Sequence, residues 1–547
     1  MSSLTNPIIP GFHPDPSALQ VGKDYYIANS TFEWWPGVDI YHSTDLVNWQ
    51  WVCSPLTRTS QVDLMGDPNA GAIWAPHLSY AKGLYWLVFT DVKTGTIYKD
   101  TLNYIVTAPS ITGPWSDPVF VTASGFDPSL FHDEDGRSWF VNMLYDWRMD
   151  HERFAGVVIQ EFDTGAKRLV GPRRHIFRGT SLGVCEGPQI YRRHGYYYLV
   201  CAAGGTEWNH AATVVRSRKL TGPWEESPHT PLITSKDNPD GPIQKAGHCS
   251  LLEYKGQWYI AYLCSRPLGR RGDCVLGRET SLDPIVWDED DWPLLANGGH
   301  NPSLHVEVKG STAKQVVDYS ESVRFTPTSG LPASFKTLRG PLRPELDYSL
   351  KERPGWLRLH GGQSLSSLHR QTLLARRWQT FDFDAFTWME FEPANFQQTA
   401  GLVLFYDTAN WMYAYVTAQE EERDCPVVRV LINEGNHFGF GSDLLPLQPG
   451  VGVGLAVKVR GSRARFYFGQ DPDNFQGEGK KLQPLGDTLP ANHLSDDHVG
   501  ALRGKTVFSG AMVGICAQDM DAHCSYADFK GFGYKEVSGI DKSCSIQ

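Results

Sequence analysis

The sequence lacks the features of several protein classes. No apolar run approaches the roughly 18 residues that a membrane-spanning helix needs. Its ten cysteines are scattered singly, without CxxC pairs or the spacing of a zinc site. The first residues, MSSLTNPIIPGF, have neither the basic nor the apolar region of a signal peptide. We therefore expect a cytoplasmic protein with reduced thiols and no membrane partner.

An excess of basic residues is absent as well. The net charge is −11, and no cluster of Lys and Arg stands out, so nucleic acid is not an expected partner. Aromatic residues are plentiful, at 12% of the chain with 18 Trp. We expect most of them in hydrophobic cores, and the others can stack on the apolar faces of sugar rings. The composition favours a neutral ligand.

A repeat organises the first half of the chain. Five segments share a Pro or small residue, an apolar strand start, a Gly-containing turn and an aromatic-rich strand. They begin at Asp15, Ala75, Asp127, Glu186 and Gly247, at intervals of 52–61 residues. A strand-rich repeat of this length is typical of a propeller blade with four strands. The pattern predicts a five-bladed β-propeller over residues 1–305.

The second half has a different pattern. Residues 306–322 are predicted to be a linker, because the surrounding sequence is rich in Gly, Asn, Pro and charge. From residue 323 to 547, apolar and polar residues alternate in segments such as 387–393, 400–407, 412–417, 453–460 and 464–469. Such period-2 segments with intervening turns predict a β-sandwich, and hence an all-β protein. Residues 326–380 give no clear strand prediction.

Propeller geometry brings three carboxylates together. The first strand of each blade lines the central axis, so Asp15, Asp127 and Glu186 are expected in one funnel, with Trp74 and His248 at matching positions. Each carboxylate alone reads as a turn or surface residue. Three at equivalent repeat positions instead favour a functional site. His248 is open to three interpretations: a core histidine, a partner of Asp15 or the sugar, or a ligand of a structural cation.

The carboxylates suit glycoside hydrolysis, which needs one carboxylic acid and one carboxylate. Asp15 and Glu186 lie on blades one and four, nearly across the funnel, and this leaves room for a sugar and a water. The arrangement favours an inverting mechanism. Asp127 lies on the blade next to Glu186, and its negative charge is expected to raise the pKa of Glu186.

Several motifs resemble those of glycoside hydrolase family 43. They are HPDPS at 13–17, WAPH at 74–77, GFDPSLFHDEDGRSWFV at 125–141, EGPQIY at 186–191, GHCSLL at 247–252 and LGRET at 276–280. The similarity is greatest to two-domain β-xylosidases that carry a C-terminal concanavalin-like sandwich. This resemblance implies inversion, with Asp15 as general base, Glu186 as general acid, and Asp127 as the group that tunes and orients the acid.

The resemblance also implies sugar-binding residues: Phe32, Trp74, Thr206, His248, Arg278 and Phe508. Tyr145 is expected to bind sugar as well, but here the chain departs from the family, which has Trp at this position, and its own Trp147 lies two residues on. Arg278 is expected to bond sugar hydroxyls, and Phe508 to close the pocket from the second domain. Some family members bind calcium at the position of His248, although no cofactor is expected to be required.

The expected function is release of xylose from the non-reducing end of β-1,4-xylo-oligosaccharides by an inverting exo-glycosidase. α-L-Arabinofuranosidase activity is expected either beside the xylosidase activity or as the main activity. The alternative from a different functional class is a sugar-binding propeller without catalytic activity. Whether the chain forms a homo-oligomer is left open.

Overall fold

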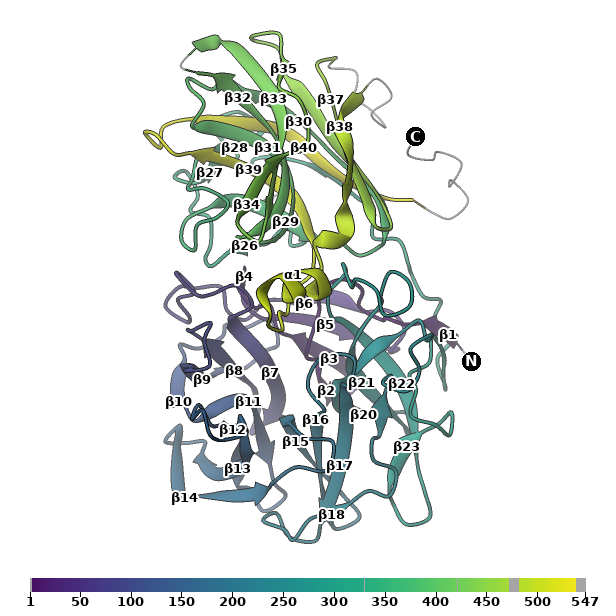
Figure 1. Ribbon diagram of the computed structural model, residues 1–547. Coiled ribbons are helices and arrows are strands. Elements are labelled where there is room, and N and C mark those ends of the chain that lie inside the picture. The colour runs from purple at the N-terminus through teal and green to yellow at the C-terminus, as the bar shows by residue number, and fades with distance from the viewer. Residues whose placement is uncertain (1, 329, 421, 472–481, 538–547) are drawn as a thin grey trace. The chain divides into compact units, whose positions relative to one another are not determined.

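The computed structural model describes residues 2–328, 330–420, 422–471 and 482–537. Its contacts divide the chain into two units (Figure 1). The first contains Met1–Arg271 and Arg278–Val316, and the second contains Gly272–Gly277 and Val317–Gln547. The division falls inside the predicted linker 306–322, whose ends belong to short strands. No pattern in the sequence predicts that residues 272–277 group with the second unit.

The first unit consists of five antiparallel sheets, which confirms the five-bladed propeller. Blades one and two contain β2 (Ser17–Val21), β3 (Asp24–Asn29), β5 (Asp39–Ser43) and β6 (Gln50–Cys53), then β7 (Ala72–Ala81), β8 (Leu84–Val92), β9 (Thr101–Ala108) and β10 (Val119–Thr122). Blade three contains β11 (Gly125–His132), β12 (Ser138–Tyr145), β13 (Phe154–Asp163) and β14 (Arg168–Phe177).

The last two blades complete the ring. Blade four contains β15 (Cys185–Arg193), β16 (Tyr196–Ala203), β17 (Ala211–Ser217) and β18 (Glu225–Glu226), with β19 (Ile233–Thr234) added against β17. Blade five contains β20 (Gln244–Tyr254), β21 (Gln257–Ser265), β22 (Glu279–Trp287) and β23 (Pro293–Leu295). The first strands β2, β7, β11, β15 and β20 contact one another in a closed ring. They are therefore the strands around the axis.

The two ends of the propeller sequence meet at blade five. β1 (Ser2–Thr5) pairs antiparallel with β24 (His305–Val308). The buried side chain of Asn6 donates hydrogen bonds to the carbonyl oxygens of Leu282 and Ser303, both at 2.8 Å. Between β3 and β5 lies the short strand β4 (Trp34–Trp35). The N-terminal segment thus ties the first residues to the last blade.

The aromatic-rich second strand of each blade explains the packing between blades. Successive side chains of a strand point to opposite faces of its sheet. In blade one, Tyr25 and Ile27 join the core shared with blade five, whereas Tyr26 and Ala28 join the core shared with blade two. The other four second strands divide their side chains in the same way, which gives five cores between neighbouring blades. Each fully buried large apolar side chain contributes on the order of 2–3 kcal/mol.

The second unit is a two-sheet β-sandwich, and its predicted strands are confirmed. One sheet contains β27 (Tyr348–Ser349), β28 (Leu357–His360), β40 (Tyr526–Glu536), β30 (Asp382–Phe391), β36 (Val453–Arg460), β37 (Arg463–Gly469) and β38 (Gln483–Pro490), with β25 (Glu321–Arg324) on β40. The other contains β29 (Thr372–Arg377), β39 (Met512–Asp519), β31 (Gln398–Asp407), β32 (Asn410–Gln419), β33 (Glu422–Glu434) and β34 (His437–Phe440), with β35 (Leu445–Pro446) on β33. β26 (Thr337–Leu338) lies between β25 and β27 in the sequence. β30 and β36 of the first sheet contact β31 of the second.

One short helix interrupts the strands of the sandwich. The 3-10 helix η2 (Ala491–His493) leads into α1 (Asp496–Arg503). Ser495 caps α1 by accepting a hydrogen bond from the backbone N–H of His498, and Gly504 ends the helix in the left-handed conformation. No helix in the described part of the chain is long and apolar enough to cross a membrane.

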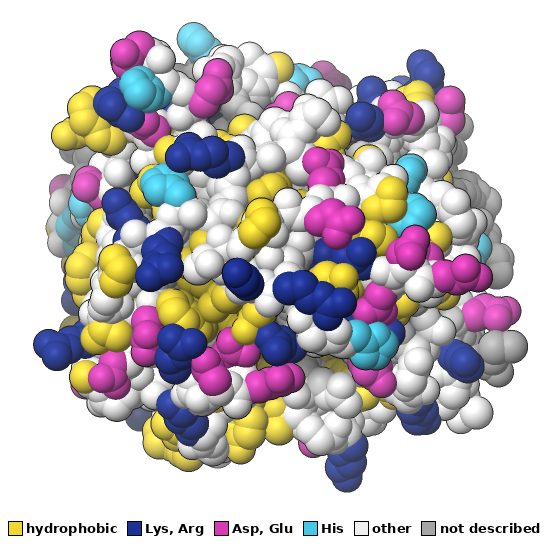
Figure 2. All heavy atoms as spheres, turned by 90° about the horizontal axis from the view of Figure 1, so that it is seen from below, with side chains coloured by type: hydrophobic (Ala, Val, Ile, Leu, Met, Phe, Trp, Pro, Cys, Tyr) yellow, Lys and Arg dark blue, Asp and Glu magenta, His cyan; other side chains and the backbone are white. Residues whose placement is uncertain are grey.

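Charges of both signs are mixed on the surface. Figure 2 shows Lys and Arg side chains interspersed with Asp and Glu over one face of the molecule. Ion pairs of the first unit include Arg137 with Asp135 at 2.7 Å and Arg193 with Asp291 at 2.9 Å. The Arg137–Asp135 pair is exposed, and such pairs contribute little to stability. The nine cysteines of the described residues are free thiols.

Candidate functional site

The same backbone irregularity occurs near the start of four inner strands. The pairing register breaks at Trp74–His77 in β7, Phe126–Ser129 in β11, Glu186–Gln189 in β15 and Gly247–Cys249 in β20. Three of these breaks contain a proline, which has no N–H to give to the ladder. A β-bulge re-aims a side chain out of the regular alternation. The repeated motif therefore re-aims a side chain near the start of the inner strand on four of the five blades.

Positive φ angles accompany these breaks. Asp15 has φ 54°, Asp127 has φ 51° and His248 has φ 23°. This region is unfavourable for residues with a side chain and costs of order 1–3 kcal/mol each. All three side chains are also buried, although all three are polar. Strain combined with polar burial is typical of a functional site rather than of a core.

Asp15 lies between two polar side chains. Ser30 Oγ donates a 2.5 Å hydrogen bond to Asp15 Oδ2, and His248 Nδ1 lies 3.4 Å from Asp15 Oδ1. Burial, helped by the nearby Arg278 charge, lowers the pKa of His248, and the Asp15 charge opposes this effect. The imidazole is therefore neutral near pH 7, and it orients Asp15 without a full positive charge.

The other ring edge of His248 meets Gly187. A Cβ at position 187 would lie 2.7 Å from His248 Nε2, and Gly187 has φ +59°. Any side chain there would displace the imidazole. Calcium prefers six to eight oxygen ligands. Among the described residues, His248 does not belong to a group of three or more His, Cys, Asp or Glu whose ligand atoms are close enough to hold one ion. We therefore assign no step to calcium, and calcium binding stays a prediction.

Asp127 and Glu186 form a coupled pair of carboxyl groups. Burial raises the pKa of Glu186 to about 7, with Arg278 opposing the rise and Asp15 adding to it. The pKa of Asp127 lies well above its usual value because of burial first, and then because of the charges of Glu186 and Asp15. The sequence predicted the upward shift on Glu186 with Asp127 as its cause. In the structure the shift comes from burial, and Asp15 is the charge that adds to it, whereas the repulsion between Glu186 and Asp127 raises the pKa of Asp127.

Replacing Asp127 tests this coupling. Because the two carboxyls repel each other, the pair holds its last proton to a higher pH than either group alone. Asp127→Asn removes one charge, so the alkaline limb of the kcat/KM–pH profile should move to lower pH. The amide keeps an acceptor for the Gly187 N–H that bonds Asp127. An unmoved alkaline limb in a folded, active variant would show that Asp127 does not share the essential proton.

An unbroken row of aromatic rings includes Phe126, which directly precedes Asp127 in the sequence. Its centroid distances are 5.5 Å for Phe12–Phe32, 6.4 Å for Phe32–Trp74, 5.1 Å for Trp74–Phe126 and 5.8 Å for Phe126–Tyr145. Phe32, Trp74 and Tyr145 were expected to bind sugar, and the structure brings them into one row. Phe12 and Phe126 were missed. Their signal was their place in the GF dipeptides that precede the HPDP and DPS motifs.

The row ends at a cavity on blade three. Tyr145 donates a 2.7 Å hydrogen bond from its hydroxyl to the carbonyl of Ile97. Its side chain also lines a cavity of about 670 Å³, together with Trp147, Arg148, His151, His175 and Arg178. The row of rings is therefore continuous, through Tyr145, with a cavity on blade three.

Arg278 is buried among the ionisable groups of the funnel. Its charge acts on Asp127, Glu186 and His248, so it lies close to all three. Thr206 is half-buried in the connection between β16 and β17. The expected roles of Arg278 and Thr206 in binding the sugar stay predictions.

His210 is a further residue that sequence reasoning missed. Its Nδ1 donates a 2.9 Å hydrogen bond to the Lys245 carbonyl, and its ring packs on Gly247, where a Cβ would come within 2.5 Å. Burial lowers its pKa to about 3. Nε2 has no hydrogen-bond partner among the described residues, so it offers a neutral acceptor beside His248. The only sequence signal was its place four residues after Thr206.

Phe508 belongs to the second unit, between α1 and β39. Its side chain is half-buried, and it is not among the fully buried apolar residues of the sandwich. The neighbouring Ser509 N–H donates a 2.8 Å hydrogen bond to Asp496 in α1. The expected role of Phe508 in closing the sugar pocket stays a prediction.

Comparison with known families accounts for almost the whole chain. Residues 4–293 match the model of glycosyl hydrolases family 43, and residues 322–535 match that of the beta xylosidase C-terminal concanavalin A-like domain. The xylosidase/arabinosidase 43B of Humicola insolens is 44% identical over 98% of each chain. The beta-xylosidase of Bacillus subtilis is 41% identical, over 97% of this chain and 99% of that one.

A solved structure supports the same assignment. The crystal structure of xylan beta-1,4-xylosidase from Bacillus halodurans matches with a TM-score of 0.92 and 44% identity, over 97% of this chain and 100% of that one. The five-bladed propeller and the concanavalin A-like sandwich agree with that assignment. The chain belongs to glycosyl hydrolase family 43.

Proposed function

We propose that this glycoside hydrolase is an inverting exo-enzyme that releases xylose from the non-reducing end of β-1,4-xylo-oligosaccharides. α-L-Arabinofuranosidase activity in the same site is the second activity. The names of the relatives support both substrates, since one is a beta-xylosidase and another a xylosidase/arabinosidase. The observation that carries the proposal is the set of three carboxylates brought to one axis by bulged or strained strand starts.

In the proposed mechanism Asp15 is the general base. It removes a proton from a water molecule, whose oxygen bonds to the anomeric carbon on the face opposite the leaving group. Ser30 fixes Asp15 Oδ2 by hydrogen bonding, and His248 lies near Oδ1. This contact with two side chains from other segments limits the carboxylate to one orientation, as attack in a defined direction requires.

Glu186 is the general acid of the proposal. As the bond from the anomeric carbon to the glycosidic oxygen breaks, Glu186 gives its proton to the departing oxygen. A pKa of about 7 keeps a large share of Glu186 protonated at neutral pH. Glu186 is also more exposed than Asp15 or Asp127, which suits contact with a leaving group. No cofactor is needed, because the two carboxyls supply both proton transfers.

The aromatic row and Arg278 are proposed to hold the sugar. Phe32 and Trp74 offer ring surfaces to the apolar face of xylose, while Arg278 donates hydrogen bonds to its hydroxyls. Lys99 lies 5.6 Å from the Trp74 ring centroid and adds a positive charge beside the row. Tyr145, at the other end of the row, is proposed to contact the following sugar.

Parallel rates on two aryl glycosides test the substrate assignment. We expect an aryl β-D-xylopyranoside to be cleaved with a higher kcat/KM than the matching aryl α-L-arabinofuranoside. If both use one site, each should inhibit cleavage of the other competitively, and Asp15→Asn should abolish both activities. A higher kcat/KM on the arabinofuranoside would make the protein primarily an arabinofuranosidase. Non-competitive inhibition would contradict a shared site.

A further inference from the structure

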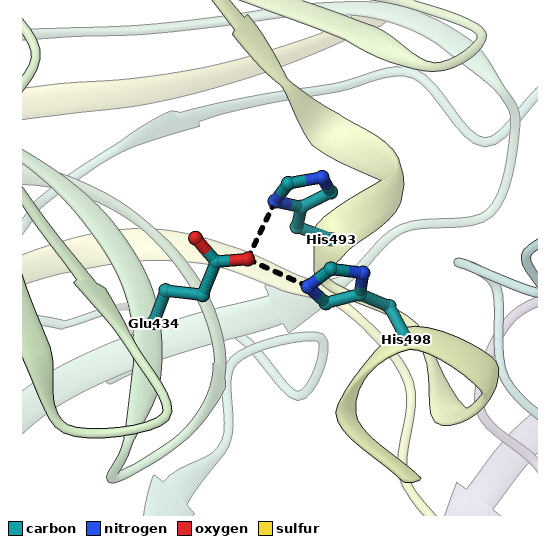
Figure 3. A group of neighbouring side chains, drawn as sticks. All are labelled: Glu434, His493 and His498. Carbon is teal, nitrogen blue, oxygen red and sulfur yellow. Dashed lines mark hydrogen bonds and ion pairs between the residues drawn. The ribbon is translucent and has the colours of Figure 1, made fainter. Parts of the chain in front are cut away.

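Two histidines and a glutamate meet in the second unit, within the described residues and apart from the three carboxylates. Glu434 ends β33, His493 ends η2, and His498 lies in α1 (Figure 3). Glu434 Oε1 lies 2.8 Å from His493 Nδ1 and 2.6 Å from His498 Nε2. The two imidazole rings stack with a centroid distance of 3.9 Å and an interplanar angle of 9°. Both rings thus point a nitrogen at one carboxylate oxygen.

The segments that carry Glu434 and the two histidines are each anchored to other parts of the second unit. β33 and β34 form the hairpin in which Glu434 pairs with His437. α1 is attached to the end of β31 by a 2.5 Å hydrogen bond from Tyr406 to Asp496 and a 2.7 Å ion pair of Arg503 with Asp407. The capped turn at Ser495 separates His493 from His498 and brings their rings side by side. The three side chains therefore converge from anchored segments.

The donor set matches a transition metal better than a hard cation. Two imidazole nitrogens and one carboxylate oxygen are ligands that Zn²⁺ and related ions prefer, whereas Ca²⁺ and Mg²⁺ prefer oxygen. Within the described ranges, this is the only group of three or more His, Cys, Asp or Glu whose ligand atoms all lie within 4.8 Å. Side-chain exposures of 23–39% leave access for an ion and a water.

The geometry needs only a small adjustment. With metal–ligand bonds of about 2.0–2.1 Å in a tetrahedron, neighbouring ligand atoms stand about 3.3 Å apart. The nitrogen–oxygen distances here are 2.6 and 2.8 Å. The ligand atoms would therefore move apart by roughly half an ångström, which side-chain rotation allows. Asp273, which accepts a 2.8 Å hydrogen bond from Asn492, adds negative charge next to His493.

We propose that Glu434, His493 and His498 bind one divalent ion of the Zn²⁺ class, with water as the fourth ligand. The ion ties α1 to the β33–β34 hairpin. Its role is structural, since it fastens the segment that runs from η2 through α1 to the strand β39.

Metal binding to the full-length chain tests the proposal. The protein is stripped with a chelator, dialysed, incubated with ZnCl₂, desalted and analysed for bound zinc and for thermal unfolding. We expect one zinc per chain and a rise in the Tm of the sandwich transition of about 3–8 °C at saturation. Co²⁺ in place of Zn²⁺ should give the visible absorption of a four-coordinate site. No retained zinc and no Tm rise would overturn the proposal.

Matched variants locate the ion. Glu434→Gln keeps the size and a hydrogen-bond acceptor but removes the anionic ligand, so zinc affinity should fall at least tenfold. His493→Gln combined with His498→Gln should abolish both zinc retention and the Tm rise. His360→Gln removes the histidine of another His–Glu pair in the same unit, at 3.5 Å, and should bind zinc as the parent does. Equal zinc retention in Glu434→Gln, in the double variant and in His360→Gln would place the ion elsewhere.

Discussion

Asp15→Asn should lower kcat by about 10²–10⁴-fold on xylobiose and on 2,4-dinitrophenyl β-xyloside alike. Water must be activated whatever the leaving group is, so a good leaving group cannot compensate for a lost base. Asn is preferable to Ala here, because Asp15 has φ 54° and Asn tolerates this conformation. The amide oxygen also keeps the acceptor that Ser30 uses. Steady-state kinetics on both substrates provides the measurement.

A second buried carboxylate serves as the control for Asp15. Asp283 lies on β22 of blade five, is 1% exposed and accepts a 2.7 Å hydrogen bond from the Tyr262 hydroxyl. Asp283→Asn also removes one buried charge from the propeller, but away from the funnel, so folded variant protein should keep its kcat. Near-parent turnover of the dinitrophenyl substrate by Asp15→Asn would remove Asp15 from the role of base.

Glu186→Gln should lower the kcat of the two substrates by different factors. Xylobiose needs a protonated leaving oxygen, and its kcat should fall by about 10²–10⁴-fold. Dinitrophenolate departs without a proton, so the dinitrophenyl xyloside should lose far less. Comparing the two rates in the same preparation removes any effect of misfolding, because a smaller active fraction lowers both equally.

The pH profile gives Glu186 a second readout. An acid must be protonated to act, and the pKa of Glu186 is about 7, so parent activity should fall as the pH rises through about 7. With the dinitrophenyl substrate, Glu186→Gln should lack this alkaline limb. Equal losses on both substrates, or an alkaline limb that persists in the variant, would mean that Glu186 is not the acid.

The repeat made the propeller and its three carboxylates predictable. Each blade repeats the same apolar strand, turn and aromatic strand, and equivalent positions in a closed ring must meet at the axis. Asp15, Asp127 and Glu186 were found in this way, because each begins a repeat motif and is followed by a proline or by Gly-Pro. The strands of the sandwich were predicted from the alternation of apolar and polar residues, which is clear in β37, where every second residue is buried.

Features outside the repeat were not predictable. His210 lies in a connection rather than at a repeat position, and only the fold packs its ring against Gly247. The grouping of residues 272–277 with the second unit depends on contacts with segments more than 200 residues away, such as the Cys274 N–H bonded to Asp497. The Glu434–His493–His498 group joins two segments about 60 residues apart with no metal-ligand spacing in the sequence. Such contacts follow from tertiary packing, and no local pattern encodes them.

The configuration of the first product tests the central claim most directly. Asp15 lies just before the first strand of blade one, Glu186 lies in the first strand of blade four, and these blades are not neighbours in the ring of five. This placement suits the gap of about 6.5–9.5 Å between the carboxyls of inverting enzymes, in which a water fits between base and sugar. Proton NMR of xylobiose hydrolysis, recorded before mutarotation, should therefore show the α-anomer of xylose first. Initial appearance of β-xylose would mean a double displacement through a covalent intermediate, and would contradict Asp15 as a base that acts through water.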